Sequence, residues 1–391
     1  MHICDEKMCT GCSTCSVKCP RNAIRMQQDS EGFFRPFIDN NLCIECQCCK
    51  QVCPSNQENT RNYGMQTSAY AYMNQDVVVR RKSSSGGAFM ALAQYVISHN
   101  GVVFGATFDN NYYVRLTKAE SLQDVYPMMG SKYVESLVGE SYREAEQLID
   151  QGKMVLFTGL PCQIAGLYSY LGEKACSDLL YTVDLLCHGV PSSKLFTSYI
   201  STIEEHLGKI ERYTFRDKSK WGWGNWGSIE YKKGNKLKTK MILPASDYYY
   251  GLFFIENCFR ESCYKCKYAH LPRIGDISIG DFWGIEETLP LKEIRDGVSL
   301  ILVNNDHAKS LLLKAEMYDE FNMADLTTAC DINKTIIEPT KRPDSRDYFY
   351  LGIEEIGFVE NAKKYVKVRT IIPVISRYVP KRIKRFLRKL K

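Results

Sequence analysis

Two cysteine runs near the start of the chain constrain its fold more than any other feature. Each has the form Cys-x2-Cys-x2-Cys-x3-Cys-Pro, and the two end at Cys19-Pro20 and Cys53-Pro54. In such runs three thiolates bind one 4Fe–4S cube, and the fourth cysteine ligates the other cube. The pattern therefore predicts a small bacterial-type ferredoxin domain with two clusters. The expected ligands are Cys9, Cys12, Cys15 and Cys53 for one cluster, and Cys43, Cys46, Cys49 and Cys19 for the other.

Structural zinc is the alternative use of closely spaced cysteines, and it explains these runs less well. Zinc sites usually draw on two Cys-x2-Cys pairs. Such pairs leave the third cysteine, the x3 spacing and the trailing proline of each run unexplained. Cys4 and Cys48 fall outside the pattern, and we interpret them as bystanders.

Length and cysteine content together indicate the compartment. The chain has 391 residues, enough for two or three domains, and 17 cysteines. The start has no apolar signal region, and no stretch approaches the roughly 20 apolar residues of a transmembrane helix. We therefore expect a cytoplasmic protein whose thiols bind metal rather than form disulfides.

The basic charge is concentrated at the end of the chain. Residues 377–391 hold eight Lys or Arg and no acidic residue, which leaves −2 (6 − 8) of the formal +6 for the rest. The apolar side chains of this tail follow helical spacing opposite the basic ones, as in a helix lying on an anionic membrane surface. They are Ile383, Phe386, Leu387 and Leu390. A frayed basic terminus is the alternative. No motif that reads nucleic acid accompanies the charge, so no nucleic-acid partner is expected.

Strands and helices alternate beyond the ferredoxin segment. Strand-like runs at 153–157 and 180–187 each precede a helical pattern, which predicts an α/β (α+β) body with a partly parallel sheet. The glycine-broken stretch at about 210–243 predicts an antiparallel insertion. The expected domains are the ferredoxin domain at 1–57, a linker at 58–67, the first part of the body at 68–150, a catalytic and cofactor-binding part at 151–345, and a helical extension with the basic tail at 346–391.

A third group of cysteines lies in the body. Cys258, Cys263 and Cys266 fall within nine residues, but a cube needs a fourth ligand. Cys187, at the end of a predicted strand, and Cys162, beside a predicted strand-to-helix turn, are both candidates. Zinc binding or simple packing is the alternative, because this spacing is less diagnostic than a ferredoxin run.

Two loops are suited to hold an anion. The segments 83–87 and 158–161 each connect a predicted strand to a helix, where backbone N–H groups and the helix N-terminus attract phosphate. Taken singly, such a loop is more often an ordinary cap or turn. Taken together, the two suit the pyrophosphate of a flavin dinucleotide.

Five motifs then occur in one order along the body. They are Ser84-Ser-Gly-Gly, Gly130-Ser-Lys-Tyr, Thr158-Gly-Leu-Pro-Cys-Gln-Ile-Ala-Gly, Asp184-Leu-Leu-Cys-His-Gly-Val-Pro-Ser and Gly275-Asp-Ile-Ser-Ile-Gly-Asp-Phe-Trp-Gly. This ensemble resembles the coenzyme F(420) hydrogenase/dehydrogenase beta-subunit family over roughly residues 68–345. The resemblance implies a flavoprotein body with bound FAD, a nearby cluster, and two-electron exchange with a deazaflavin or another organic substrate.

Individual residues of the body can be weighed as site residues, and the resemblance adds the third cluster and the FAD contacts. His188 is expected to donate a proton, with a turn beside the cluster as its alternative role, and Cys162 is a second catalytic candidate. Asp281 holds a ribose hydroxyl or caps a turn. The third cluster is expected on Cys187, Cys258, Cys263 and Cys266. The remaining FAD contacts are expected from Ser84, Ser85, Gly86, Gly87, Lys132, Thr158, Gly159, Pro161 and Gln163.

Two functions of different classes follow. The first is a free-standing FAD and iron–sulfur oxidoreductase that takes electrons from a soluble ferredoxin or similar donor. Its organic substrate would be a deazaflavin or an intermediate of a polysaccharide pathway, and its tail predicts peripheral contact at the inner membrane surface. The alternative is an electron-transfer beta subunit of a larger hydrogenase or dehydrogenase complex, without a substrate of its own. The fused ferredoxin and the basic tail favour the first.

Overall fold

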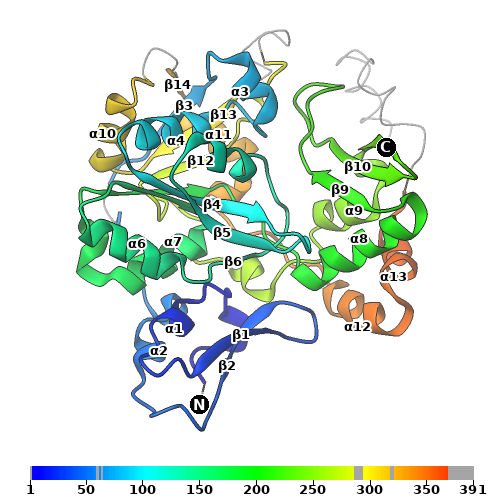
Figure 1. The fold of residues 1–391 in the computed structure, drawn as a ribbon, viewed down its shortest axis with the longest axis horizontal. Helices are drawn as coiled ribbons and strands as arrows, with labels where there is room; N and C mark the ends of the chain where they lie inside the picture. The colour runs from blue at the N-terminus through cyan, green and yellow to red at the C-terminus, as the bar shows by residue number, and fades with distance from the viewer. Residues whose placement is uncertain (1, 59–60, 63–64, 286–293, 318–320, 369–391) are drawn as a thin grey trace.

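The largest element of the structure is a nine-stranded mixed sheet (Figure 1). The computed structural model describes residues 2–58, 61–62, 65–285, 294–317 and 321–368. The strands, in sheet order, are β14 (Phe321–Ala324), β3 (Ser68–Tyr72), β13 (Ser299–Val303), β12 (Ile277–Asp281), β8 (Leu180–Leu185), β7 (Val155–Gly159), β4 (Val102–Phe108), β5 (Val114–Ala119) and β6 (Ser136–Leu137). Strands β12, β8, β7 and β4 run parallel to one another, and the strands from β14 to β12 pair antiparallel. The partly parallel α/β body predicted from the sequence is confirmed.

Helices cover both faces of this sheet, because successive residues of a strand point to opposite sides. Leu156 of β7 belongs to a core shared with the helices above the sheet in Figure 1, and Phe157 belongs to one shared with the helices below it. The helices above are α4 (Ala88–Ser98), α5 (Leu122–Val125) and α10 (Asp306–Lys314), and those below are α6 (Ser141–Asp150) and α7 (Pro161–Leu171). Two shorter helices, α3 (Val77–Lys82) and α11 (Leu326–Ile332), flank β3 and β13.

A second lobe packs around a cluster of aromatic side chains. Its antiparallel sheet, in the order β11-β10-β9, confirms the predicted insertion. Phe196, Phe215 and Tyr249 are almost fully buried at its centre. Its elements are β9 (Ile210–Thr214), β10 (Gly227–Lys233), β11 (Lys236–Ile242), α8 (Ser193–Leu207), α9 (Tyr248–Phe254), α12 (Arg346–Ile356) and α13 (Phe358–Tyr365).

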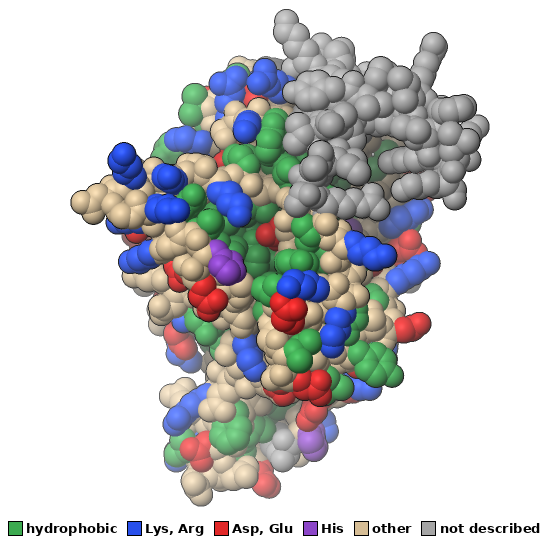
Figure 2. All heavy atoms as spheres, turned by 90° about the vertical axis from the view of Figure 1, so that its right-hand side faces the viewer, with side chains coloured by type: hydrophobic (Ala, Val, Ile, Leu, Met, Phe, Trp, Pro, Cys, Tyr) green, Lys and Arg blue, Asp and Glu red, His purple; other side chains and the backbone are tan. Residues whose placement is uncertain are grey.

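Basic side chains gather on the outer side of this lobe. Figure 2 shows that side, with many Lys and Arg side chains in its upper half, away from the ferredoxin segment. Lys236, Lys238 and Lys240 are exposed along β11, which lies at the edge of its sheet. Lysines on an edge strand discourage pairing with the strand of another chain. The basic tail at 377–391 lies outside the described residues, so its membrane contact stays a prediction.

The ferredoxin segment lies below the large sheet in Figure 1 and packs against both lobes. Phe33 is fully buried in the aromatic core of the second lobe, and Val17 is buried in the core beneath α6 and α7. The segment consists of α1 (Thr14–Val17), β1 (Ile24–Gln28), β2 (Phe34–Ile38) and α2 (Cys48–Gln51), with short 3-10 turns η1 (Glu6–Met8) and η2 (Pro54–Asn56). Across the described residues, no helix has both the length and the apolar character needed to cross a bilayer.

Candidate functional site

The ferredoxin cysteines line two small cavities. The first, called the inner cavity, is lined by Cys9, Cys12, Cys15 and Cys53, together with Cys4. The second, called the outer cavity, is lined by Cys19, Cys43, Cys46 and Cys49, together with Cys48. Each cavity thus brings together one of the two ligand sets predicted from the spacing. Cys4 and Cys48, which we interpreted as bystanders, also lie on the cavity walls.

Cys4 interacts directly with two of the inner cysteines. Hydrogen bonding from Cys4 lowers the pKa of Cys9 to about 5 and that of Cys53 to about 6. A low pKa favours the thiolate, the form in which cysteine binds metal. Cys4 therefore lies in direct contact with two expected ligands, which its position outside the repeat did not reveal.

A third cavity lies in the body and differs from the sequence expectation in one ligand. It is lined by Cys162, Cys187, Cys263 and Cys266. Cys162 lies in the first turn of α7, Cys187 follows β8, and the other two belong to or follow the 3-10 turn η6 (Glu261–Lys265). Cys162 and Cys187, the two alternatives for the fourth ligand, therefore line the same cavity.

Cys258 does not line the third cavity. It is fully buried in the aromatic core, and its carbonyl oxygen accepts a hydrogen bond from the Tyr350 hydroxyl at 2.8 Å. Cys263 packs against the same core but also lines the third cavity, which Cys258 does not. Around the third cavity, the expected grouping with Cys258 is therefore replaced by one with Cys162.

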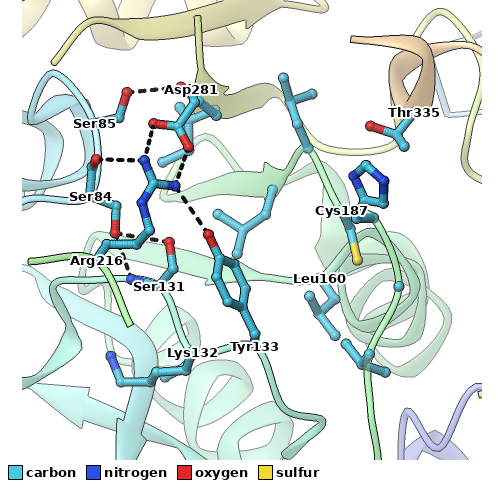
Figure 3. A pocket seen from close by; sticks show the side chains of 18 of the residues that line it. Ser84, Ser85, Ser131, Lys132, Tyr133, Leu160, Cys187, Arg216, Asp281 and Thr335 are labelled. Carbon is cyan, nitrogen blue, oxygen red and sulfur yellow. Dashed lines mark hydrogen bonds and ion pairs between the residues drawn. The ribbon is translucent and has the colours of Figure 1, made fainter. Parts of the chain in front are cut away.

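A much larger cavity of about 690 Å³, called the main cavity, opens beside the carboxyl ends of β7, β8 and β12. Figure 3 shows Ser84 and Ser131 on one side of it and Cys187 on the other. The Ser84 hydroxyl oxygen accepts hydrogen bonds from the backbone N–H and the hydroxyl of Ser131, at 2.6 and 2.8 Å. Edges of this kind in α/β sheets commonly bind ligands.

The loop before α4 forms one wall of the main cavity. Ser84, Ser85 and Gly87 line it, and Gly87 adopts a left-handed φ of 93° as the N-cap of α4. Gly86 has a different role, because it does not line the cavity. A Cβ atom on Gly86 would lie 2.1 Å from the carbonyl oxygen of Tyr72, so glycine is needed for close packing of the loop on β3.

Lys132 lines the main cavity, but its amine is engaged in the protein. Its Nζ donates to the carbonyl oxygens of Met128, Met129 and Gly130 at 3.1–3.2 Å. Burial lowers the pKa of Lys132 to about 7. The side chain thus holds its own loop in place at the cavity wall.

Asp281 also lines the main cavity and is paired with Arg216. The distances are 2.6 Å from Arg216 Nη1 to Oδ2 and 3.1 Å from Nη2 to Oδ1, and Trp223 Nε1 donates to Oδ1 at 2.7 Å. Arg216 also donates to the Tyr133 hydroxyl (Figure 3). The carboxylate already accepts three hydrogen bonds, so it stabilises the cavity wall. The sequence analysis suggested a ribose contact or a turn cap for Asp281, and not this role.

The loop between β7 and α7 separates the main cavity from the third cavity. Thr158, Gly159 and Gln163 line the main cavity, whereas Pro161 lines the third. The Thr158 hydroxyl donates to the Phe104 carbonyl at 2.7 Å, so it ties β7 to β4. Gln163 Oε1 accepts from the backbone N–H of Leu160 at 3.0 Å, which closes the first turn of α7.

The cavities adjoin one another in a row. Cys187 and His188 line both the main and the third cavity, while Thr10 and Ser55 line both the third and the inner cavity. His188 Nε2 lies 3.0 Å from Glu256 Oε1, and its side chain is half exposed. Cys162 lines the third cavity and not the main one, so its place is among the cysteines.

The comparisons with known proteins agree with this arrangement. Residues 152–329 match the family model that describes the C terminus of the coenzyme F(420) hydrogenase/dehydrogenase beta subunit. Residues 8–57 match the 4Fe–4S dicluster domain. Over residues 152–329, the chain is therefore similar to the C-terminal part of this beta subunit. The resemblance seen in the motifs is confirmed, and so is the assignment of 4Fe–4S clusters to the ferredoxin segment.

No curated protein matches the chain. One similar solved structure is a chain of the F(420)-reducing NiFe hydrogenase complex from Methanosarcina barkeri, in a xenon derivative. It is 17% identical, the match covers 79% of this chain and 94% of that chain, and the TM-score is 0.45.

Proposed function

We propose that this chain is an iron–sulfur electron-transfer subunit, in which three 4Fe–4S clusters form a row that ends at a flavin in the main cavity. One observation carries the proposal. The inner and third cavities have lining residues in common, and so do the third and main cavities. A row of this kind suits one-electron transfer, which needs short steps between centres. The match to a beta-subunit model supports this function better than the free-standing enzyme that we expected first.

The donor sets suit the proposed clusters. The third cavity is lined by four cysteines, and the inner and outer cavities are each lined by the four expected ligands and one further cysteine, so each holds the four thiolates that a 4Fe–4S cube requires. Cys15 of the inner cavity and Cys49 of the outer cavity are buried in one small core, so these two cavities are neighbours as well. The proposed order is therefore outer, inner, third and main.

The main cavity suits a flavin dinucleotide. Its volume falls within the usual range for cofactor and ligand sites. The helix N-termini of α4 and α7 lie at its walls, where backbone N–H groups favour phosphate oxygens. A bound flavin would supply exchange between a two-electron reaction and one-electron centres. Ser84, Ser131 and the Arg216–Asp281 pair would fix the walls around it.

The outer cluster is the proposed contact with a one-electron protein partner, such as a soluble ferredoxin. Cys46 is exposed there, and Ile44, which lines the same cavity, is 60% exposed. Apolar side chains around an exposed redox centre allow a partner protein to approach closely. An organic substrate, whether a deazaflavin or a polysaccharide-pathway intermediate, would belong to the main cavity at the opposite end of the row.

Iron, acid-labile sulfide and flavin content of the anaerobically purified protein test the proposal. We expect about twelve irons, as three cubes imply, and about one flavin per chain. Ser131→Trp should fill the main cavity beside Ser84 and remove the flavin while keeping the iron. Ser98→Trp, at the exposed end of α4, is the matched control. About eight irons and no flavin, even after FAD is added, would contradict the proposal.

A further inference from the structure

Arg260 occupies an unusual position between two of the cysteine cavities. It is 1% exposed, immediately precedes η6 and lines the third cavity. Its Nη2 also touches the Cys9–Cys12 loop of the ferredoxin segment, because a Cβ atom on Gly11 would lie 2.8 Å from it. One buried guanidinium therefore faces both the third and the inner set of cysteines.

The hydrogen bonds of Arg260 account for part of its guanidinium group. Nη2 donates to the Glu135 carboxylate and, at 3.2 Å, to the Phe34 carbonyl oxygen. Nε and Nη1 are buried and have no protein acceptor. The guanidinium carbon lies 4.7 Å from the centre of the Phe33 ring, on which the group stacks. Buried N–H donors are costly when unpaired, so these two suit acceptor atoms within the cavity that Arg260 lines.

The charge of Arg260 lies beside both sets of expected ligands. Cys263 follows Arg260 by three residues and lines the same cavity. Gly11, which lies next to Nη2, stands between Cys9 and Cys12 and lines the inner cavity. Arg260 does not line the outer cavity.

We propose that Arg260 sets the reduction potentials of the inner and third clusters together. The proposal rests on the proposed function, since both clusters must be present. Reduction adds one negative charge to a cluster, and a buried cation stabilises that charge strongly where the dielectric constant is low. Hydrogen bonds to cluster sulfurs and the net charge around a cluster are established determinants of its potential. Arg260 supplies positive charge to two adjacent clusters and free N–H donors to the third one, and so keeps their potentials high.

Glu135 provides a test of opposite sign. It is 5% exposed and is the counter-ion of Arg260, and its carboxylate also accepts from the backbone N–H of Ser193 at 3.0 Å. Replacing Glu135 with Gln leaves the charge of Arg260 unopposed, so both potentials should rise. Replacing Arg260 with Gln should lower them. A purely structural role for Arg260 predicts no such reversal.

The experiment is a redox titration of the full-length protein with its clusters, followed by electron paramagnetic resonance, after iron content has been measured. Arg260→Gln should shift the ratio of reduced to oxidised cluster at least tenfold toward oxidised, about 59 mV for one electron. The shift should affect the inner and third clusters and spare the outer one. Arg260→Lys, which keeps the charge, should shift them less. Arg342→Gln is the matched control, because Arg342 pairs with Glu261 of η6 but does not line the cavity.

Each outcome separates this proposal from the proposed function. If the unaltered protein contains too little iron for a third cluster, the result would count against the proposed function itself. With all clusters present, unmoved potentials in both Arg260→Gln and Glu135→Gln would overturn the role of Arg260. An equal shift of all three clusters would also overturn it. If Arg260→Gln does not assemble, the direction of the Glu135→Gln shift decides.

Discussion

Replacing Asp281 with Asn should destabilise the body by about 3–5 kcal/mol, the usual cost of breaking a buried ion pair by removing one partner. The Arg216 side chain is 1% exposed and that of Asp281 is 14% exposed, so water replaces little of the lost interaction. The carboxylate makes two contacts with the guanidinium and accepts from Trp223 Nε1. Asn offers one oxygen and no charge, so a buried cation is left without its counter-ion.

The cost at an exposed pair provides the comparison. Lys118 and Glu120 lie 3.5 Å apart, with side chains that are 46% and 63% exposed. Exposed pairs contribute about 0–1 kcal/mol, so Glu120→Gln should change the free energy of unfolding by no more than that. In the double variant Arg216→Met/Asp281→Leu, two apolar side chains replace the pair, and much of the stability should return.

The four tryptophans of the chain make this site easy to observe, because Trp221, Trp223, Trp226 and Trp283 all lie near it in the sequence or the fold. Trp223 stacks on Trp283 at 4.6 Å between ring centres, and Arg216 lies 5.2 Å from the Trp283 ring. Urea unfolding followed by tryptophan fluorescence therefore reports on the pair directly. A cost for Asp281→Asn no larger than that for Glu120→Gln would refute the reasoning and return Asp281 to the role of a ligand contact.

Two further predictions concern the cysteines and Lys132. Cys162→Ser should remove about four of about twelve irons, whereas Cys258→Ser should keep them all, as measured by iron and sulfide assay; the reverse result would restore the ligand set expected from sequence. Burial lowers the pKa of Lys132 from 10.5 to about 7, so between these values the unfolded chain binds one more proton than the folded one. The free energy of unfolding should then rise with pH in this window, by up to about 1.4 kcal/mol per unit. Unfolding measured at several pH values should show a flatter profile for Lys132→Met, and an unchanged profile would contradict the shift.

The ferredoxin ligands could be predicted from sequence because their geometry is local. A run with fixed spacing folds around its cube whatever surrounds it, and the cavities group the cysteines as the spacing implied. The third set is different, since Cys162 and Cys187 come together only because β7 and β8 are parallel neighbours in the sheet. Local spacing also suggested Cys258, whose side chain the aromatic core takes instead.

The walls of the main cavity were predictable as loops but not as contacts. The strand-to-helix positions of Ser84 and Gly159 follow from alternating sequence patterns, and both line the cavity. The pairing of Arg216 with Asp281 joins the end of β12 to the insertion, 65 residues apart. The role of Arg260 could not be predicted from the sequence. It depends on contact with the ferredoxin segment, some 250 residues earlier in the chain, and a single sequence does not show which distant segments pack together.

The ferredoxin segment packs on the body in a way that fixes the position of the inner cavity relative to the third cavity. Cys162 and Gly166 are four residues apart on α7 and so lie on one face of the helix, about 6 Å apart along its axis. Cys162 lines the third cavity, while a Cβ atom on Gly166 would lie 3.2 Å from Cys12 Cβ and 2.6 Å from Thr14 Oγ1. One turn of one helix thus sets the separation of the inner and third cavities. Because Phe33 is also buried in the second lobe, the segment is held at two places. In the proposed path, electrons would therefore need no domain movement to pass from the inner cluster to the third.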